Sequence, residues 1–144
     1  MKLKATETGV KEKHSKRGRS SKNKGANYER DIAKKFQSKY GIELKRTQQS
    51  GGFSKKSEKA DDFRGDITIV DTKQMLRVHI ECKDQKSWSL PKWIEQSESD
   101  CPEGRVPLVV FHKHGTSKDY VCLSLDDFLS IVPKDKIVGK RVFN

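Results

Sequence analysis

The residues of this chain whose types and spacing suit a chemical reaction lie between Gly65 and Lys83. Asp66 begins one apolar run, and the tripeptide Glu81-Cys82-Lys83 ends another. Two carboxylates and an amine on neighbouring strands can hold a divalent metal ion and a water molecule against a phosphodiester. The segment therefore makes phosphodiester hydrolysis the first candidate chemistry.

The two apolar runs are typical of β-strands. We expect strands at residues 66–70 and 75–83, joined by a turn at residues 71–74. Apolar and polar side chains alternate along the second strand, and successive side chains of a strand point to opposite faces of the sheet. Glu81 and Lys83 should therefore share one face.

This arrangement would suit Mg²⁺, which prefers oxygen ligands and keeps several of its waters. Asp66, Glu81 and the backbone carbonyl of Cys82 would bind the ion. Lys83 would orient the attacking water or help to deprotonate it. The alternative is an exposed hairpin in which Glu81 and Lys83 are ordinary surface charges and Asp66 caps the start of a strand.

The chain has 144 residues, enough for one domain of ordinary size, and a formal net charge of +11. The charge is uneven, because residues 1–24 contain nine Lys or Arg and only Glu7 and Glu12. We expect residues 1–24 to be a disordered basic arm and residues 25–144 to form a single domain. Such a charge favours a polyanionic partner, in particular nucleic acid.

Cys82, Cys101 and Cys122 are odd in number and lack C-x-x-C spacing, so we expect reduced thiols instead of disulfides. No apolar run approaches the length that spans a membrane. The N-terminus also lacks the apolar stretch of a secretory signal. We therefore expect a soluble, cytoplasmic protein with no membrane partner.

Hydrophobic periodicity predicts the remaining elements. Apolar side chains recur at every fourth position from Tyr28 to Tyr40, which indicates an amphipathic helix at residues 27–40, capped by Asn27 and ended by Gly41. We then expect a strand at residues 42–47 and a long polar loop at residues 48–65. A helix should start at Ser89-Leu90-Pro91 and run towards Asp100. Two strands at residues 107–112 and 120–125 should follow, and then a last helix, capped by Ser124 or Asp126, that ends before Pro133. The order is helix, three strands, helix, two strands, helix, which predicts an α/β fold around a mixed central sheet.

Four short motifs follow one another over residues 24–90. They are Lys24-Gly25-Ala26-Asn27-Tyr28-Glu29-Arg30, then Lys45-Arg46 before Ser50-Gly51-Gly52, then Gly65-Asp66-Ile67, and last Ile80-Glu81-Cys82-Lys83. Together, and in this order, they resemble the archaeal-type Holliday-junction resolvases of the PD-(D/E)xK nuclease superfamily. The resemblance implies a restriction-endonuclease-like core.

The resemblance also implies a role for each matching residue. Glu29 would join Asp66 and Glu81 around the metal ions, with Lys83 as the catalytic lysine and Ser50 near the scissile phosphate. The cofactor would be Mg²⁺, with Mn²⁺ as a substitute and no small-molecule cofactor beyond the metal. The partners would be branched DNA, above all four-way junctions, and a second copy of the chain, because a two-fold dimer presents two identical sites to the two strands to be cut.

Basic and aromatic side chains near these motifs are candidate contacts to DNA. Arg30 and Arg46 match family positions needed for activity. Trp88 would stack on an unpaired base, or pack in the core or at a dimer interface. The expected DNA contacts are Arg30, Lys45, Arg46, Lys55, Lys56, Arg64, Lys86 and Trp88.

Two departures from the family pattern concern the first aspartate. Gly65 stands where the family usually has proline, and Asp61 and Asp62 lie close enough to compete with Asp66 as the metal ligand. We expect Asp66, because it begins the apolar strand. The leading hypothesis is an Mg²⁺-dependent endonuclease that resolves four-way junctions and leaves a 5′-phosphate and a 3′-hydroxyl. The alternatives are a nicking or restriction-like endonuclease of the same fold and a nucleic-acid-binding module without catalysis.

Overall fold

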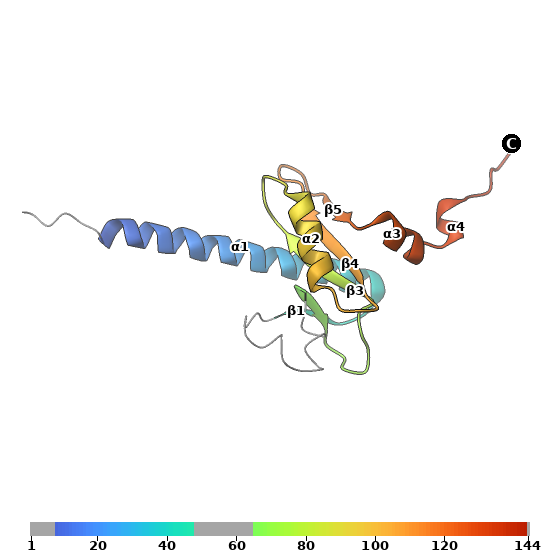
Figure 1. The fold of residues 1–144 in the computed structure, drawn as a ribbon, viewed down its shortest axis with the longest axis horizontal. Helices are drawn as coiled ribbons and strands as arrows, with labels where there is room; N and C mark the ends of the chain where they lie inside the picture. The colour runs from blue at the N-terminus through green and yellow to red at the C-terminus, as the bar shows by residue number, and fades with distance from the viewer. Residues whose placement is uncertain (1–7, 48–64, 144) are drawn as a thin grey trace, which may run out of the picture.

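The structure is a computed structural model that describes residues 8–47 and 65–143, with the side chains of residues 8–17 excepted. Figure 1 shows the arrangement of its helices and strands. They are α1 (Thr8–Tyr40), β1 (Leu44–Arg46), β2 (Ile67–Ile69), β3 (Val78–Lys83), α2 (Leu90–Asp100), β4 (Val106–His112), β5 (Asp119–Cys122), α3 (Leu125–Ile131) and α4 (Lys134–Ile137). This order agrees with the predicted one, except that the short helix α4 was not predicted.

The described strands form a two-stranded pair and a mixed three-stranded sheet. β1 and β2 are antiparallel, with Leu44 opposite Ile69. β3 and β4 are parallel, and β5 pairs antiparallel with β4. The N–H of Asp66 donates to the carbonyl of Ile80 at 2.9 Å, which ties the pair to the larger sheet. The predicted α/β class with a mixed sheet is confirmed, and it is compatible with a restriction-endonuclease-like core.

Helix α1 covers one face of the sheet (Figure 1). Its side chains Tyr28, Ile32 and Ala33 are buried, at the spacing that places residues on one face of a helix. They pack against Leu44, Ile67, Ile80, Leu108 and Val110. Phe36 is partly buried and Tyr40 is exposed, so the predicted apolar stripe contributes to the core only as far as Phe36.

Helix α2 packs on the opposite face, where the ring of Trp93 lies 5.9 Å from that of Phe111. The side chains of β3 alternate as predicted. Ile80 belongs to the core beneath α1, whereas His79 and Glu81 point the other way, with 3.9 Å between His79 Nε2 and Glu81 Oε2. Because His79 is fully buried, it does not face the solvent from which DNA would approach.

Helix α1 begins much earlier than predicted. The disordered arm expected at residues 1–24 is helical from residue 8, and Asn27 lies within the helix instead of capping it; residues 1–7 lie outside the described part of the chain. Lys and Arg are good helix formers, and extending an existing helix requires no new nucleus. The predicted end is confirmed, because Gly41 has φ +64° and its N–H donates to the carbonyl of Gln37 at 2.9 Å.

A polar network fixes α1 to the hairpin of β4 and β5. Asp119 Oδ1 accepts the hydroxyl of Tyr28 at 3.0 Å and lies 2.9 Å from His112 Nδ1, while Lys35 pairs with the other oxygen. Burial raises the pKa of Asp119, but these three hydrogen bonds outweigh it, so the net shift is downward. The carboxylate is therefore charged at neutral pH and holds the helix against the hairpin.

The cysteines are free thiols, as predicted. Burial, together with the nearby charges of Asp66 and Glu29, raises the pKa of the Cys82 thiol. A thiol of raised pKa is protonated and unreactive at neutral pH. Among the helices of the described part of the chain, none is both long and apolar enough to cross a membrane.

The last predicted helix is also confirmed. Ser124 caps α3, because its hydroxyl oxygen accepts the N–H of Asp127 at 3.1 Å. The helix ends at Ile131, before Pro133 as expected. Neither α3 nor the short α4 contains a buried residue, in contrast to α1 and α2.

Candidate active site

Asp66 is attached to β3 at both its backbone and its side chain. Its N–H donates to the carbonyl of Ile80 at 2.9 Å, and its Oδ2 accepts the N–H of Cys82 at 2.7 Å. The residue is only 5% exposed. A buried carboxylate needs such partners, because losing water without replacing its hydrogen bonds is costly. The two bonds place Asp66 beside the end of β3 that carries Glu81.

Gly65 makes this attachment possible. Its φ is +80°, and a Cβ at this position would lie 3.0 Å from the carbonyl oxygen of Ile80 and 3.1 Å from Nδ1 of His79. Proline is confined to a φ near −65°, so it cannot adopt this conformation. The departure from the family's usual proline, noted in the sequence, thus has a structural reason.

Glu81, Lys83 and Gln96 form a second group beside Asp66. Glu81 is 7% exposed, and its Oε1 lies 3.4 Å from Lys83 Nζ, so the predicted common face of these two residues is confirmed. Gln96 of α2 bridges them: its Oε1 accepts from Lys83 Nζ at 2.8 Å, and its Nε2 donates to Glu81 Oε1 at 3.1 Å. The lysine amine is therefore held by two acceptors.

From the sequence alone, Gln96 could orient a metal-bound water or a phosphate, but the favoured interpretation is a surface amide, so Gln96 is not among the predicted site residues. Its place in the sequence, three residues after Trp93, puts it near the same side of the helix, since residues three to four apart share one face. In the structure Trp93 and Ser97 are buried and Gln96 is exposed, so Gln96 lies at the edge of the face of α2 that packs on the sheet. The periodicity of α2 does not specify which residues of β3 lie next to this face.

Glu29, the third predicted carboxylate, approaches from α1. It forms an ion pair with Nε of Arg46, a residue predicted to contact DNA. Its negative charge reaches the cluster, because it contributes to raising the pKa values of Asp66 and Glu81. The structure thus places Glu29 close enough for its charge to affect Asp66 and Glu81. At the same time, the Glu29 carboxylate forms an ion pair with Arg46.

The pKa of Asp66 is raised to about 7. Burial is the largest cause, followed by the charge of Glu81; the N–H of Cys82, through its hydrogen bond, and the charge of Lys83 oppose the rise. Burial also raises the pKa of Glu81, against the attraction of Lys83. Crowded, desolvated carboxylates of this kind are stabilised by a proton or by a cation.

A divalent metal ion fits this donor set, since buried carboxylate oxygens are the ligands that hard cations prefer. Within residues 8–47 and 65–143, no group of three or more His, Cys, Asp or Glu side chains is arranged to hold a metal. The side chains of Asp66 and Glu81 would therefore bind it together with backbone, water or phosphate oxygens. The carbonyl of Cys82, between Glu81 and Lys83 in sequence, stays the predicted backbone ligand.

The other predicted site residues are scattered. Arg30, Lys45, Lys86 and Trp88 are exposed, and Arg30 donates to Asn27 Oδ1 at 2.9 Å. Residues that lie outside the described part of the chain are Ser50, Lys55, Lys56 and Arg64, together with Asp61 and Asp62. Their roles stay predictions.

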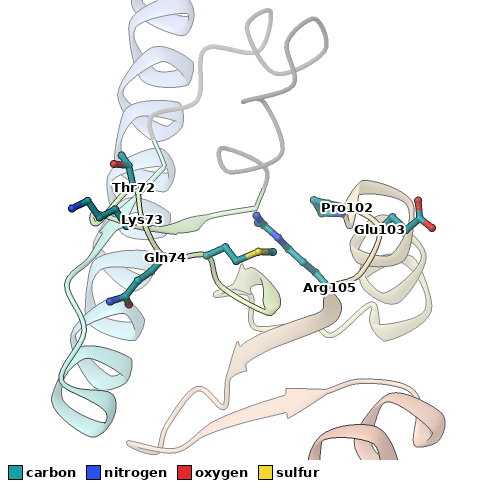
Figure 2. Close-up of a pocket in the computed structure, with 7 residues that line it drawn as sticks. Thr72, Lys73, Gln74, Pro102, Glu103 and Arg105 are labelled. Atoms are coloured by element: carbon teal, nitrogen blue, oxygen red, sulfur yellow. The ribbon is translucent and has the colours of Figure 1, made fainter.

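A pocket of about 390 Å³ lies elsewhere, at the loop that precedes β3 and the loop that precedes β4 (Figure 2). The side chain of Arg105 reaches into it from β4's side, while that of Glu103 points away. The lining residues are Thr72, Lys73, Gln74, Met75, Pro102, Glu103 and Arg105. None belongs to the carboxylate cluster, so the chemistry of the side chains, and not a cavity, marks the candidate active site.

The close approach at Gly65 predicts the effect of adding a methyl group. Gly65→Ala introduces backbone strain and a contact with the Ile80 carbonyl, whereas Gly104→Ala introduces only strain, because Gly104 also has φ +80° but nothing lies within 4 Å of its Cβ. We expect Gly104→Ala to lower the free energy of unfolding by about 1–2 kcal/mol, and Gly65→Ala to lower it clearly more. Urea unfolding measures both, and equal losses would contradict the close approach.

The pKa of Asp66 predicts a pH dependence of stability in protein without metal. Because folding raises this pKa from 3.8 to about 7, its stabilising contribution is complete below pH 3.8 and is lost as the pH rises through about 7. Wild-type protein should therefore lose stability relative to Asp66→Asn over this range, by on the order of a few kcal/mol. Urea unfolding with a chelator tests this, with the exposed Asp126→Asn as control. Parallel curves for wild type and Asp66→Asn would refute it.

Comparison with known proteins identifies the family to which this site belongs. The family described as "Phage putative PDDEXK endonuclease" matches residues 20–143, a range that contains Glu29, Asp66, Glu81 and Lys83. Searches of curated proteins and of solved structures gave no match. PDDEXK nucleases usually use divalent metals. The carboxylates of Asp66 and Glu81 are ligands of the kind that such metals prefer. The match supports the nuclease superfamily named in the sequence resemblance and does not extend to its archaeal resolvases. The chain belongs to the phage putative PDDEXK endonuclease family.

Proposed function

We propose that this nuclease is a DNA endonuclease that depends on a divalent metal, Mg²⁺ or Mn²⁺, and that Asp66, Glu81 and Lys83 surround the reacting phosphate. The observation that carries the proposal is the buried pair Asp66 and Glu81 beside a lysine amine that two acceptors hold in place. Burying two carboxylates close together destabilises a fold unless a proton or a cation neutralises their charge. A divalent cation bound at the end of β3 would provide this neutralisation.

In this reaction a water oxygen attacks the phosphorus, the bond from phosphorus to the 3′ oxygen breaks, and a proton passes to that oxygen. The products are a 5′-phosphate and a 3′-hydroxyl. A bound divalent ion would supply Lewis-acid chemistry to the phosphate and lower the pKa of a bound water. Lys83 offsets the negative charge that develops on the phosphate, and Gln96 keeps its amine beside Glu81 before the substrate arrives.

The distribution of charge supports DNA as the substrate. Helix α1 extends away from the sheet (Figure 1), and its residues 8–24 include seven Lys or Arg and only one acidic residue, Glu12. The same helix carries Glu29 into the carboxylate cluster. Exposed Arg30, Lys45 and Lys86 add further positive charge to the surface. Cations along a rigid helix attract the phosphate backbone without choosing a sequence.

Substitution of Glu81 or Lys83 tests the assignment of the active site. Glu81→Gln and Lys83→Met should each reduce Mg²⁺- or Mn²⁺-dependent cleavage of labelled DNA by about 100-fold or more, because each removes a group at the reacting phosphate. Glu95→Gln, an exposed neighbour of Gln96, should cleave like wild type. Fluorescence anisotropy should show that all three variants still bind DNA.

Chelation of the metal should abolish cleavage by the wild-type protein. If Glu81→Gln cleaves normally, the proposed site is wrong. If the wild type binds DNA but cleaves none with either metal, the alternative of a binding module without catalysis is favoured.

We propose four-way junctions as the preferred substrate. Support comes from the order of the motifs around Glu29, Asp66, Glu81 and Lys83, which resembles that of the archaeal-type resolvases. The wild type should cut a synthetic four-way junction at two symmetric positions, and at least ~10-fold faster than a linear duplex of the same sequence at the same salt concentration, since salt alone changes affinity strongly. Equal rates would instead favour the nicking or restriction-like alternative.

A further inference from the structure

The imidazole of His79 is buried beside the candidate active site, although no step of the proposed reaction uses it. His79 lies on β3 two residues before Glu81, and both side chains point to the face of the sheet on which α2 packs. The residue is 1% exposed, and its side chain is fully covered. Burying a polar ring costs free energy, and histidine is less often fully buried than the aliphatic residues. The contacts of this ring therefore need an explanation.

One edge of the ring lies against the segment that carries Asp66. A Cβ built at Gly65 would lie 3.1 Å from Nδ1 and 3.2 Å from Cε1 of His79. The backbone of Gly65 thus approaches the imidazole closely. Because Gly65 directly precedes Asp66, the ring limits how near this segment can come to the face of β3 that carries Glu81.

The other nitrogen of the ring lies beside Glu81. The distance from His79 Nε2 to Glu81 Oε2 is 3.9 Å, which is longer than a hydrogen bond but leaves the carboxylate little room to move towards the ring. Oε1 of Glu81 accepts from Lys83 Nζ at 3.4 Å and from Gln96 Nε2 at 3.1 Å. Both oxygens of Glu81 therefore have neighbours that restrict the side chain.

Such restriction matters for a metal ion that two carboxylates share. The hydrogen bonds of Asp66 to β3 fix the backbones that carry the two carboxylates, but the Glu81 side chain has torsions of its own. Mg²⁺ demands near-ideal octahedral geometry with short bonds, whereas Ca²⁺ accepts longer bonds and variable geometry. A group that limits the spacing of the carboxylates therefore affects Mg²⁺ more than Ca²⁺.

We propose that His79 is a positioning residue, whose ring spaces the Glu81 side chain from the Gly65–Asp66 segment and thereby favours Mg²⁺ over Ca²⁺. The inference rests on the metal site of the proposed function and adds a determinant of its ion preference. The role depends on the shape and place of the ring and not on its charge. His79 thus acts through Glu81 and touches neither the metal ion nor DNA.

Ion competition tests the proposal without cleavage. Electron paramagnetic resonance measures free Mn²⁺ during a titration of the full chain without DNA, and added Mg²⁺ or Ca²⁺ then displaces the bound ion. His79→Ala removes the spacer and should weaken Mn²⁺ binding by at least ~10-fold, the usual effect of losing a group that orients a ligand. The affinity for Mg²⁺ should fall by a larger factor than that for Ca²⁺. His79→Gln, which retains a long side chain with an N–H donor, should bind Mn²⁺ more tightly than His79→Ala.

Val110→Ala is the matched control. It removes a buried side chain from the opposite face of the sheet, beneath α1, so it should lower stability but leave the ratio of Mg²⁺ to Ca²⁺ affinity unchanged. If His79→Ala does not fold, His79→Val provides a similar truncation with a residue that strands favour.

Three results would overturn the proposal, and they can be told apart. Truncated His79 variants that bind all three ions like the wild type would exclude the positioning role and leave the metal site intact. Equal losses for Mg²⁺ and Ca²⁺ would reduce His79 to a structural residue. A wild type that binds no Mn²⁺ at millimolar concentration would contradict the metal site of the proposed function, and the role of His79 with it.

Discussion

The attachment of Asp66 to β3 is the constraint on which the rest of the site depends. The N–H of Asp66 donates to the carbonyl of Ile80, and its carboxylate accepts the N–H of Cys82, so the backbone of β3 holds both the main chain and the side chain of this residue. The approach is so close that the preceding residue must be glycine in the left-handed region. Because Glu81 lies between the two anchor residues, the same two bonds also fix the separation of the two carboxylates.

Helix α1 joins this site to the rest of the molecule. Its buried residues Tyr28 and Ile32 form the core, while Glu29 between them reaches the carboxylate cluster. The Asp119 network holds the same stretch of helix against β4 and β5. Since α1 is one continuous helix from Thr8 to Tyr40, the basic extension continues directly from the segment that carries Glu29. The orientation of the cationic surface is therefore set by the packing of the core.

Much of the fold could be predicted from local patterns, and the failures have identifiable causes. Alternation in β3 placed Glu81 and Lys83 on one face, and the four-residue period placed Tyr28 and Ile32 in the core, because both depend only on backbone geometry. The helical state of residues 8–24 was missed because composition describes a segment in isolation, whereas helix extension is cooperative. Gln96 was missed because its neighbours depend on where α2 rests along β3, which no local pattern specifies.

The contact of Lys83 with Glu81 and Gln96 has a consequence for the protein before any metal binds. The amine of Lys83 supplies positive charge to Glu81, while the backbone N–H of Cys82 supplies a donor to Asp66. Carboxylates that would otherwise repel each other are thereby tolerated in the fold. Because these partners come from the chain itself, we expect the fold to form without a metal ion, in contrast to small zinc domains whose fold requires the ion. Under the proposed function, such a chain would fold where metal is scarce and would cleave only when both the ion and DNA are bound.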